Sequence, residues 1–421
     1  MNEKCRKCGA SAATRVKVCK ICGYHTLKAR LSKALVALLK VFLVLLVLGG
    51  AYYYIGWIHG TVVIESEFGT ARFGARFGDE VYLMGLADCG HFRVMIAGSS
   101  TSLELYGHNL TDNELRQIGG MSRLENLNIS NTQVVDIAHL ANLTNLRILA
   151  ISWNNISDIS PLANLTNLEV LAMSGTMVSD ISPLASLTNL ERLDIQSNLI
   201  SDLSPLANLA NLRYLFIENN TVIDISPLAH LSNLCLLSME DNFVNDISPL
   251  AYLPRLCSLR LTRNPVKDFS TIANLTNLWS ISFTISPATN LASFPALPNL
   301  SNVQIGEAVI TNNFTVLSRL PNLTGLTIYN SAIQDFCFLH ELDLRYLSIG
   351  MSELSDLAPL VEAISGFTHL QHLRLPNNQI SDLTPLAQLC SRTNLCLFGN
   401  SLITDWSPVE HLRSVRGRPS R

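Results

Sequence analysis

The stretch LEVLAMSGTMVSDISPLASLTN, residues 168–189, contains the pattern that decides the fold. Leu171 and Met173 are separated by one residue, which predicts a short strand with apolar side chains on one face and free positions on the other. Ser182-Pro183 then predicts the N-cap and first residue of a short helix, whose leucines close the core from the opposite side. One such unit cannot bury its apolar face alone, so neighbours must stack against it.

The strand pattern recurs through most of the chain at a nearly constant interval. Its first apolar position falls at Leu103, Leu127, Leu149, Leu171, Leu193, Leu215, Leu237, Leu259, Ile281, Val303, Leu326, Leu347, Leu373 and Leu395. Eight consecutive intervals are 22 residues long, and the others range from 21 to 26. A fixed period of this length is typical of a stacked repeat.

A recurring asparagine follows the first strand position by five residues. It is present at Asn154, Asn198, Asn220, Asn242, Asn264, Asn378 and Asn400. Because its amide both donates and accepts hydrogen bonds, we expect it to satisfy backbone groups in a buried turn. The same position is occupied by Ser286, Ala308, Ser331 and Ser352 in the later repeats, which predicts a locally irregular solenoid with altered curvature.

These repeats resemble the 22-residue leucine-rich repeats of internalins, a family of bacterial surface adhesins, over about residues 101–412. The resemblance implies an α/β fold, a leucine-rich repeat solenoid. Its parallel sheet lines the concave face, and short helices or 3-10 turns line the convex face. It also implies protein binding without catalysis. Many internalins are anchored at their C-termini, whereas we expect this chain to be anchored near its N-terminus.

The expected anchor is a transmembrane helix over residues 31–59. Residues 41–58 carry no charge, and Lys33 and Lys40 can reach the headgroups on the N-terminal side. Tyrosines and Trp57 form an aromatic belt at the other end. The positive-inside rule then predicts a cytoplasmic N-terminus and an extracytoplasmic repeat region. A cleaved signal peptide is disfavoured, because the apolar run starts late and no small-residue cleavage site follows it.

The first 27 residues are expected to form a zinc ribbon. Two CxxC pairs, each followed by glycine, supply four thiolates at Cys5, Cys8, Cys19 and Cys22. This spacing is suited to a closed tetrahedral zinc site, which is structural because no coordination position stays open. The alternative is four reduced structural or redox cysteines. Residues 60–100, with strand-like runs at 62–65, 81–86 and 92–96, are expected to cap the first repeat, and residues 413–421 to form a basic tail.

The outward strand positions are the candidate partner-binding site, because the core does not need them. From the fourth full repeat they become large and charged, and Trp153 flanks them. The expected contact residues are Arg192, Asp194, Tyr214, Phe216, Glu218, Glu240, Asp241, Arg260 and Arg263. Exposed aromatic side chains beside arginine and carboxylates are typical of interface hot spots. The alternative is an ordinary solvated face without a dedicated ligand.

The other chemically active residues indicate no reaction. The sequence contains no recognisable nucleophile, phosphate-binding or metalloprotease motif. Aspartates recur before the short helices at Asp158, Asp180, Asp202, Asp224, Asp246 and Asp268, and we favour hydrogen bonding to the helix start over calcium binding. Cys235 and Cys257 occupy equivalent positions in adjacent repeats, within reach of a disulfide. Cys390 and Cys396 are a second candidate pair, and free thiols are the alternative in both cases.

We therefore expect a non-enzymatic, membrane-anchored protein that binds a protein or glycan partner at the cell surface. An intracellular scaffold, similar to a repeat-containing regulatory subunit of protein phosphatases, is the second hypothesis. An enzyme with a site spread over distant repeats is the third. Nucleic acid is not expected as a partner, because residues 1–40 hold ten of the 30 basic side chains and leave the rest of the chain acidic.

Overall fold

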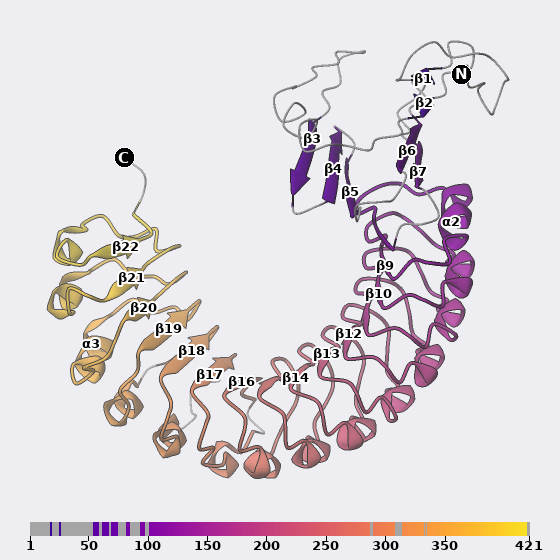
Figure 1. The fold of residues 1–421 in the computed structure, drawn as a ribbon. Coiled ribbons are helices and arrows are strands. Elements are labelled where there is room, and N and C mark those ends of the chain that lie inside the picture. The colour runs from indigo at the N-terminus through magenta and orange to yellow at the C-terminus, as the bar shows by residue number, and fades with distance from the viewer. Residues whose placement is uncertain are drawn as a thin grey trace. The chain divides into compact units, whose positions relative to one another are not determined.

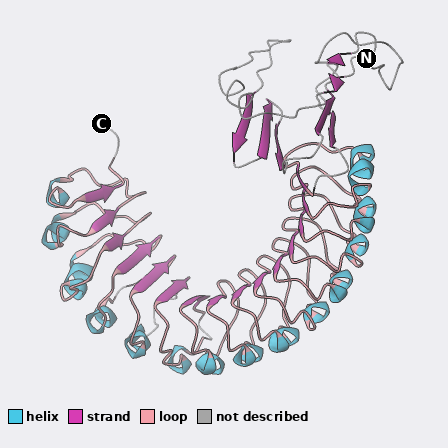
Figure 2. Ribbon diagram, in the orientation of Figure 1, coloured by secondary structure: helices cyan, strands magenta, loops and turns pink. Residues whose placement is uncertain are grey.

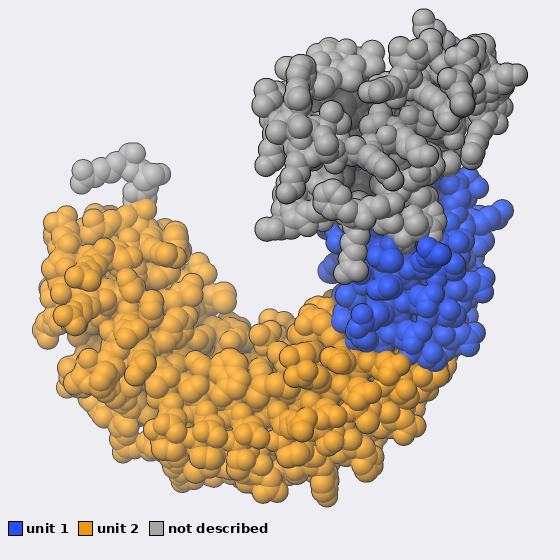
Figure 3. All heavy atoms as spheres, in the orientation of Figure 1, with its two compact units in different colours: residues 1–178 blue, residues 179–421 orange. Residues whose placement is uncertain are grey.

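The computed structural model describes residues 101–418 except 287–288, 308–313, 332 and 334, together with the backbone of strands β1 to β7 before residue 101. The chain divides into two compact units, residues 1–178 and residues 179–421 (Figure 3).

Unit 1 begins the repeat with parallel strands β8 to β11. Its elements from residue 101 are β8 (Ser102–Glu104), α2 (Asp112–Gly119), β9 (Asn126–Asn128), η1 (Ala138–Asn142), β10 (Ile148–Ala150), η2 (Ser160–Leu162) and β11 (Val170–Ala172). Leu103, Leu127, Leu149 and Leu171 lie opposite one another across these strands. Helix α2 starts with a capping box, in which Thr111 and Glu114 satisfy each other's backbone N–H groups.

Short antiparallel strands precede the repeats in unit 1. They are β3 (Tyr54–Ile58), β4 (Thr61–Ser66), β5 (Gly69–Gly74), β6 (Val81–Met84) and β7 (Arg93–Ile96). Strand β3 pairs with β4, β4 with β5, and β5 reaches β8 where Arg72 lies opposite Glu104. The sheet of the repeats therefore continues into the segment that was expected to cap it.

Strand β3 corrects the end of the expected transmembrane helix. The helix prediction is wrong for residues 54–58, whose aromatic and β-branched side chains favour a strand paired with β4. Residues 31–53 lie outside the described residues. Within the part of the chain that the structure describes, no helix combines the length and the apolar character needed to cross a bilayer.

The expected zinc ribbon is described only in its second half. Strands β1 (Lys17–Val18) and β2 (His25–Thr26) pair antiparallel on either side of residues 19–24, which carry the second CxxC pair. The four cysteines at positions 5, 8, 19 and 22 lie outside the described residues, so zinc binding stays a prediction.

Unit 2 continues the repeat with strands on one side and short helices on the other (Figures 1 and 2). Its elements are η3 (Ser182–Ser186), β12 (Arg192–Asp194), η4 (Ser204–Leu206), β13 (Tyr214–Phe216), η5 (Ser226–His230), β14 (Leu236–Ser238), η6 (Ser248–Tyr252), β15 (Ser258–Arg260), η7 (Ser270–Asn274), β16 (Ser280–Thr284), η8 (Leu291–Ser293), β17 (Asn302–Gly306), η9 (Phe314–Arg319), β18 (Gly325–Tyr329), η10 (Cys337–Glu341), β19 (Tyr346–Gly350), α3 (Ala358–Ile364), β20 (His372–Arg374), η11 (Thr384–Gln388), β21 (Asn394–Cys396), η12 (Ser407–Val409) and β22 (Ser414–Arg416). Neighbouring strands from β12 to β22 are parallel and in register.

The core is the predicted stack of inward leucines. Leu215, Leu237 and Leu259 lie opposite one another on β13 to β15, and each is 0% exposed. The asparagine ladder is confirmed as well. Asn220 is buried, and its amide bonds backbone groups both in its own turn and in the preceding repeat. Stacked leucines and stacked amides together fix the register of the strands.

The short helices are 3-10 turns, and their starts correct the N-cap prediction. In η2 the N-cap residue is Ile159, and no side chain caps this end; Ser160 is already the first helical residue. The preceding Asp158 accepts the backbone N–H of Ser160 at 2.8 Å, and the equivalent aspartates do the same in later repeats. The hydrogen-bonding role expected for these aspartates is confirmed.

The irregular repeats have longer strands and an aromatic core. Strands β16 to β19 contain five residues each, whereas β12 to β15 contain three. Phe269, Phe283 and Phe294 pack with ring centroids 4.7–5.6 Å apart. Phe283 belongs to the repeat in which Ser286 replaces the ladder asparagine. Large rings there fill the space that a regular repeat fills with leucines.

The last strand lies inside the segment expected to be a tail. Strand β22 places Val415 opposite Leu395 of β21, so residues 414–416 extend the sheet beyond the expected boundary at residue 412. The boundary was placed too early because valine occupies the leucine position in this incomplete repeat.

Candidate functional site

The predicted contact residues of unit 2 lie on the outward face of four neighbouring strands and in the turns that follow them. We call this set the β12–β15 patch: Arg192, Asp194, Tyr214, Phe216, Glu218, Glu240, Asp241, Arg260 and Arg263. In-register pairing places Arg192 beside Tyr214, and Asp194 beside Phe216. The short L-x-L strands cause this arrangement, because every inward leucine leaves its two neighbours pointing outward.

Arginines hold the aromatic part of the patch. Tyr214 and Phe216 are half-buried on β13. The Arg192 guanidinium lies 4.5 Å from the Phe216 ring centroid, and the Arg213 guanidinium lies 5.7 Å from that of Tyr214. Both distances are within the range of cation–π attraction. These contacts favour one position of each ring before any partner arrives.

Two carboxylates of the patch are held by neutral donors. The Gln196 side-chain amide donates to both oxygens of Asp194, at 3.1 and 3.3 Å. Glu240 Oε1 accepts from the hydroxyls of Thr262 and Ser282, at 3.2 and 3.1 Å. These bonds fix the orientation of both carboxylates on the outward face.

Asp241 and Arg263 were predicted as strand-face residues, and that placement is wrong. Both lie in the turn after the strand, with φ of 54° and 55°. The Arg263 guanidinium bonds both oxygens of Asp241, at 2.7 and 2.9 Å, and reaches Glu307 at 3.2 Å. These carboxylates raise the pKa of Arg263. The sequence pattern did not reveal Glu307, which is 44 residues away along the chain.

Trp153, the remaining predicted contact residue, belongs to unit 1. It is 60% exposed and has a φ of 58° in the turn after β10. Its ring covers Gly175, where any Cβ atom would clash with it. Glycine at that position therefore leaves room for the indole against the next turn.

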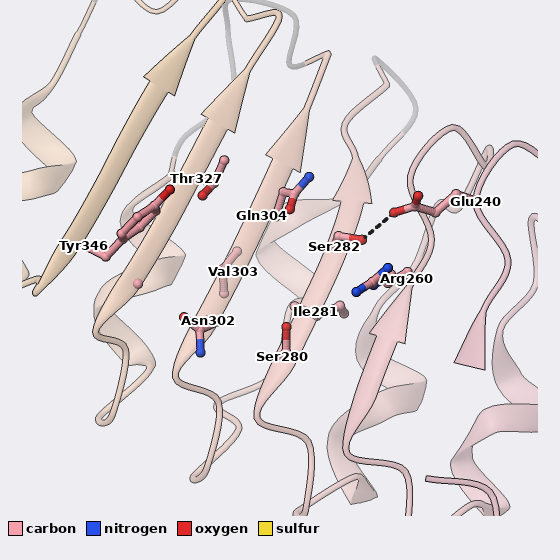
Figure 4. Close-up of a pocket in the computed structure, with 11 residues that line it drawn as sticks. Glu240, Arg260, Ser280, Ile281, Ser282, Asn302, Val303, Gln304, Thr327 and Tyr346 are labelled. Atoms are coloured by element: carbon pink, nitrogen blue, oxygen red, sulfur yellow. Dashed lines mark hydrogen bonds between the residues drawn. The ribbon is translucent and has the colours of Figure 1, made fainter. Parts of the chain in front are cut away.

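A hollow of about 450 Å³ adjoins the β12–β15 patch and was not predicted (Figure 4). We call it the β15–β19 hollow; Glu240 and Arg260 form one wall, and Tyr346 lies at the other end. Gln304 and Thr327 line it between these walls. In the sequence, only the absence of charged residues at the outward positions after Arg260 indicates this hollow. The prediction of the contact site relied on charged and aromatic residues and therefore did not include it.

Glu218 is a partly buried carboxylate of the patch. Its Oε2 atom and the neighbouring Ser238 Oγ are buried, and neither forms a hydrogen bond with a described residue. Burial raises the pKa of Glu218, the nearby Ser238 hydroxyl offsets this only in part, and Asp194 and Glu240 raise it further. The ionised form is therefore less stable in the folded protein than in the unfolded chain.

This environment predicts that replacing Glu218 raises the free energy of unfolding, by an amount that depends on pH. The folded pKa lies above the unfolded value of about 4.3, so the cost of the charge is present at neutral pH and disappears below the unfolded value. Glu218→Gln should raise the free energy of unfolding at pH 7 and leave it nearly unchanged near pH 3.5. Urea denaturation of the full chain at both pH values measures this.

Asp268 is a control residue, because its replacement should change the stability in the opposite direction. Hydrogen bonds from Ser270 lower its pKa, so its stabilising effect is present at neutral pH and is lost as the pH falls through the lowered value. Asp268→Asn should therefore destabilise the protein at pH 7. Equal shifts of the same sign in the two variants would contradict this account of Glu218.

Comparison with known proteins identifies the repeat class. Residues 77–341 match the family described as leucine-rich repeat region. The internalin InlF of Listeria monocytogenes is 32% identical, with 77% of this chain and 89% of that one covered, and its structure has a TM-score of 0.55. No curated protein matches the chain.

Two more distant structures share the fold. A leucine-rich repeat protein of Leptospira interrogans is 22% identical, with 73% of this chain and 86% of that one covered and a TM-score of 0.52. The ectodomain of the Arabidopsis thaliana receptor kinase GASSHO1/SCHENGEN3, solved in complex with CASPARIAN STRIP INTEGRITY FACTOR 2, is 20% identical, with 77% and 44% covered and a TM-score of 0.51.

Proposed function

Because this chain belongs to the leucine-rich repeat family, we propose that it is a non-enzymatic binding protein whose β12–β15 patch contacts a protein partner. The observation that carries the proposal is the fixed aromatic pair on β13. Tyr214 and Phe216 are large and partly exposed, and Arg192 and Arg213 hold them in place. Side chains ordered in advance lose less entropy on binding.

The charge of the patch suggests the character of the partner. Asp194 lies on β12, and Glu218 and Glu240 follow β13 and β14. Arg192 on β12 and Arg260 on β15 border these carboxylates. A partner surface with a basic side chain at its centre complements these carboxylates. Because Glu218 is costly to ionise, we expect a cation placed there to improve affinity more than one placed at the already bonded Glu240.

Loss of the aromatic pair should abolish binding. The double variant Tyr214→Ala/Phe216→Ala removes the central anchors, each worth about 2 kcal/mol or more in a typical hot spot. We expect at least a hundredfold loss of affinity for the partner, which corresponds to about 2.7 kcal/mol. Affinity purification with the full chain, followed by quantitative mass spectrometry, measures the retained partner.

A matched double variant removes aromatic side chains elsewhere. Tyr252 on η6 is 70% exposed, and Trp279 before β16 is 48% exposed, and neither belongs to the patch. Tyr252→Ala/Trp279→Ala should retain the partner at the level of the natural chain. If both double variants recover the same proteins in the same amounts, the β12–β15 patch is not the binding site.

The proposed location is the cell surface, with the chain anchored near its N-terminus. Residues 31–53 as a helix would span about 34 Å, enough for a hydrocarbon core of about 30 Å. The basic residues up to Lys40 favour a cytoplasmic N-terminus, where we propose that Cys5, Cys8, Cys19 and Cys22 hold a structural zinc ion.

Thiol labelling tests this location. Cys390 is exposed and is not in a disulfide, so a membrane-impermeant maleimide can reach it wherever the repeats meet the medium. We expect the peptide containing Cys390 to be labelled in intact cells, and the Cys390→Ser variant to identify that signal. Labelling of this peptide only after lysis would support the intracellular scaffold instead.

A further inference from the structure

Strands β16 to β19 of unit 2 have no charged side chains at their outward positions, whereas the strands on both sides of them do. The outward positions of β16 to β19, all of them described, carry hydroxyls, amides, glycines and tyrosines, without any charged or aliphatic side chain. Arg260 on β15 and Arg374 on β20 border this stretch. Four neighbouring strands therefore present a neutral, hydrogen-bonding surface.

Small side chains on the same strands create the β15–β19 hollow. Ser280, Ser282 and Gly325 contribute to its floor, and its volume is about 450 Å³ (Figure 4). A Cβ atom at Gly325 would clash with Asn302 Oδ1, so a larger residue there would displace that amide. The hollow follows from missing side-chain bulk, and the inward residues of these strands stay packed, with Ile281 1% and Val303 2% exposed.

The walls of the hollow are held rigidly by their own contacts. Glu240 Oε1 accepts from Ser282 and Thr262, which fixes its carboxylate at one end. At the other end the Tyr346 hydroxyl accepts from Arg374 at 3.3 Å, and its ring lies 6.1 Å from that of His372. Gln304 is exposed between them and offers an amide donor and an amide acceptor.

We propose that the β15–β19 hollow binds a neutral oligosaccharide. Sugar hydroxyls both donate and accept, as the amides and hydroxyls of the hollow do, so every polar group can be satisfied without a charge. The Tyr346 ring supplies an apolar face for the C–H groups of a sugar ring. Glu240 and Arg260, which carry opposite charges, both lie at one wall and leave the rest of the lining neutral.

A protein segment fits this surface less well. Protein partners gain affinity by burying aromatic, aliphatic or arginine anchors, and the outward side chains of β16 to β19 offer them neither an apolar pocket nor a carboxylate. Glu240 lies only at the wall beside β15. Burying a charged group over β16 to β19 without a partner would cost free energy. The chemistry therefore separates this hollow from the β12–β15 patch, with which it shares only Glu240 and Arg260. The sugar proposal stands whether or not the patch binds a protein.

The test is titration of the full chain with defined sugars. The probes are chitotetraose, cellotetraose, maltotetraose, mannotetraose and lacto-N-tetraose, with a heparin tetrasaccharide as the charged comparison. We expect at least one neutral probe to bind and to bind better than heparin. Gln304→Ala/Thr327→Val removes two hydrogen-bonding groups and should weaken that probe about tenfold or more.

The Tyr214→Ala/Phe216→Ala variant is the matched control, because it changes the neighbouring patch and should leave sugar affinity unchanged. The proposal is overturned if no neutral probe binds at millimolar concentration, if heparin binds best, or if Gln304→Ala/Thr327→Val binds as well as the natural chain. Loss of a protein partner in that variant without any sugar binding would likewise overturn it and assign the hollow to protein recognition.

Discussion

Replacing Asn220 by alanine is expected to lower the free energy of unfolding by about 3 kcal/mol. Its Oδ1 accepts the Ile200 N–H at 3.0 Å, and its Nδ2 donates to the carbonyls of Ile195 and Ile217 at 3.0 and 3.1 Å. Asn220 is 6% exposed, so water cannot replace these bonds without opening the turn. Alanine would leave donors and acceptors of two adjacent repeats unpaired at once.

Amide hydrogen exchange measures this effect where it arises. Stability in a repeat array is transmitted between neighbours, so the Ile200 amide and the flanking strands β12 to β14 should exchange faster, together with a lower urea midpoint. Asn245→Ala removes an exposed asparagine from the next repeat and should change stability by less than about 0.5 kcal/mol. Similar losses in both variants would mean that the ladder does not stabilise the turns.

Replacing Phe283 by alanine is expected to cost about 3–5 kcal/mol, the usual range for a fully buried aromatic residue. Phe283 is 1% exposed, and its ring centroid lies 4.7 Å from that of Phe269 and 5.6 Å from that of Phe294. The repeat around it lacks a ladder asparagine; the three rings pack between its turns, and the Thr289 hydroxyl donates to the Val266 carbonyl of the preceding repeat at 3.0 Å. Loss of the ring contacts should loosen β16 and β17.

Thermal and urea denaturation of the full chain measure the loss. Phe243→Ala is the matched control, because Phe243 is 57% exposed and lies in a regular repeat of the same unit. It should change the free energy of unfolding by no more than about 0.5 kcal/mol. If Phe283→Ala lowers the free energy of unfolding no more than Phe243→Ala does, the aromatic cluster does not stabilise the irregular repeats.

The repeat fold was predictable because its signals are local and redundant. Leu215, Leu237 and Leu259 recur at one interval, and each is needed at the same place in the stack. Asn220 and its equivalents add a second, polar signal with the same period. Each repeat therefore predicts the same strand and turn independently, so an irregular sequence in one repeat does not change the prediction for the others.

Where the L-x-L pattern is incomplete or absent, the structure was predicted less accurately from the sequence. Val415 forms the last strand without a full L-x-L pattern, and Tyr54–Ile58 is a strand within an apolar run that also suits a helix. The N-cap reading failed at Ser160 for a different reason. Proline follows serine there, but the aspartate two residues earlier makes the bond that a capping hydroxyl would make.

The candidate site was predictable in position and not in detail. Outward side chains such as Tyr214 and Phe216 follow from strand alternation. The ion pair of Arg263 with Glu307 does not, because it joins turns two repeats apart. The β15–β19 hollow also escaped, since small neutral residues such as Ser282 and Gly325 carry no signal until their neighbours are known.

Photo-crosslinking tests the central claim, that outward strand positions of unit 2 contact a partner, most directly. A photoreactive phenylalanine analogue is placed at position 216 on β13 or at position 252 on η6, in the full chain expressed in its own cells. We expect a partner crosslink from position 216 and none from position 252. Crosslinks only from position 252, or none from either, would contradict the account.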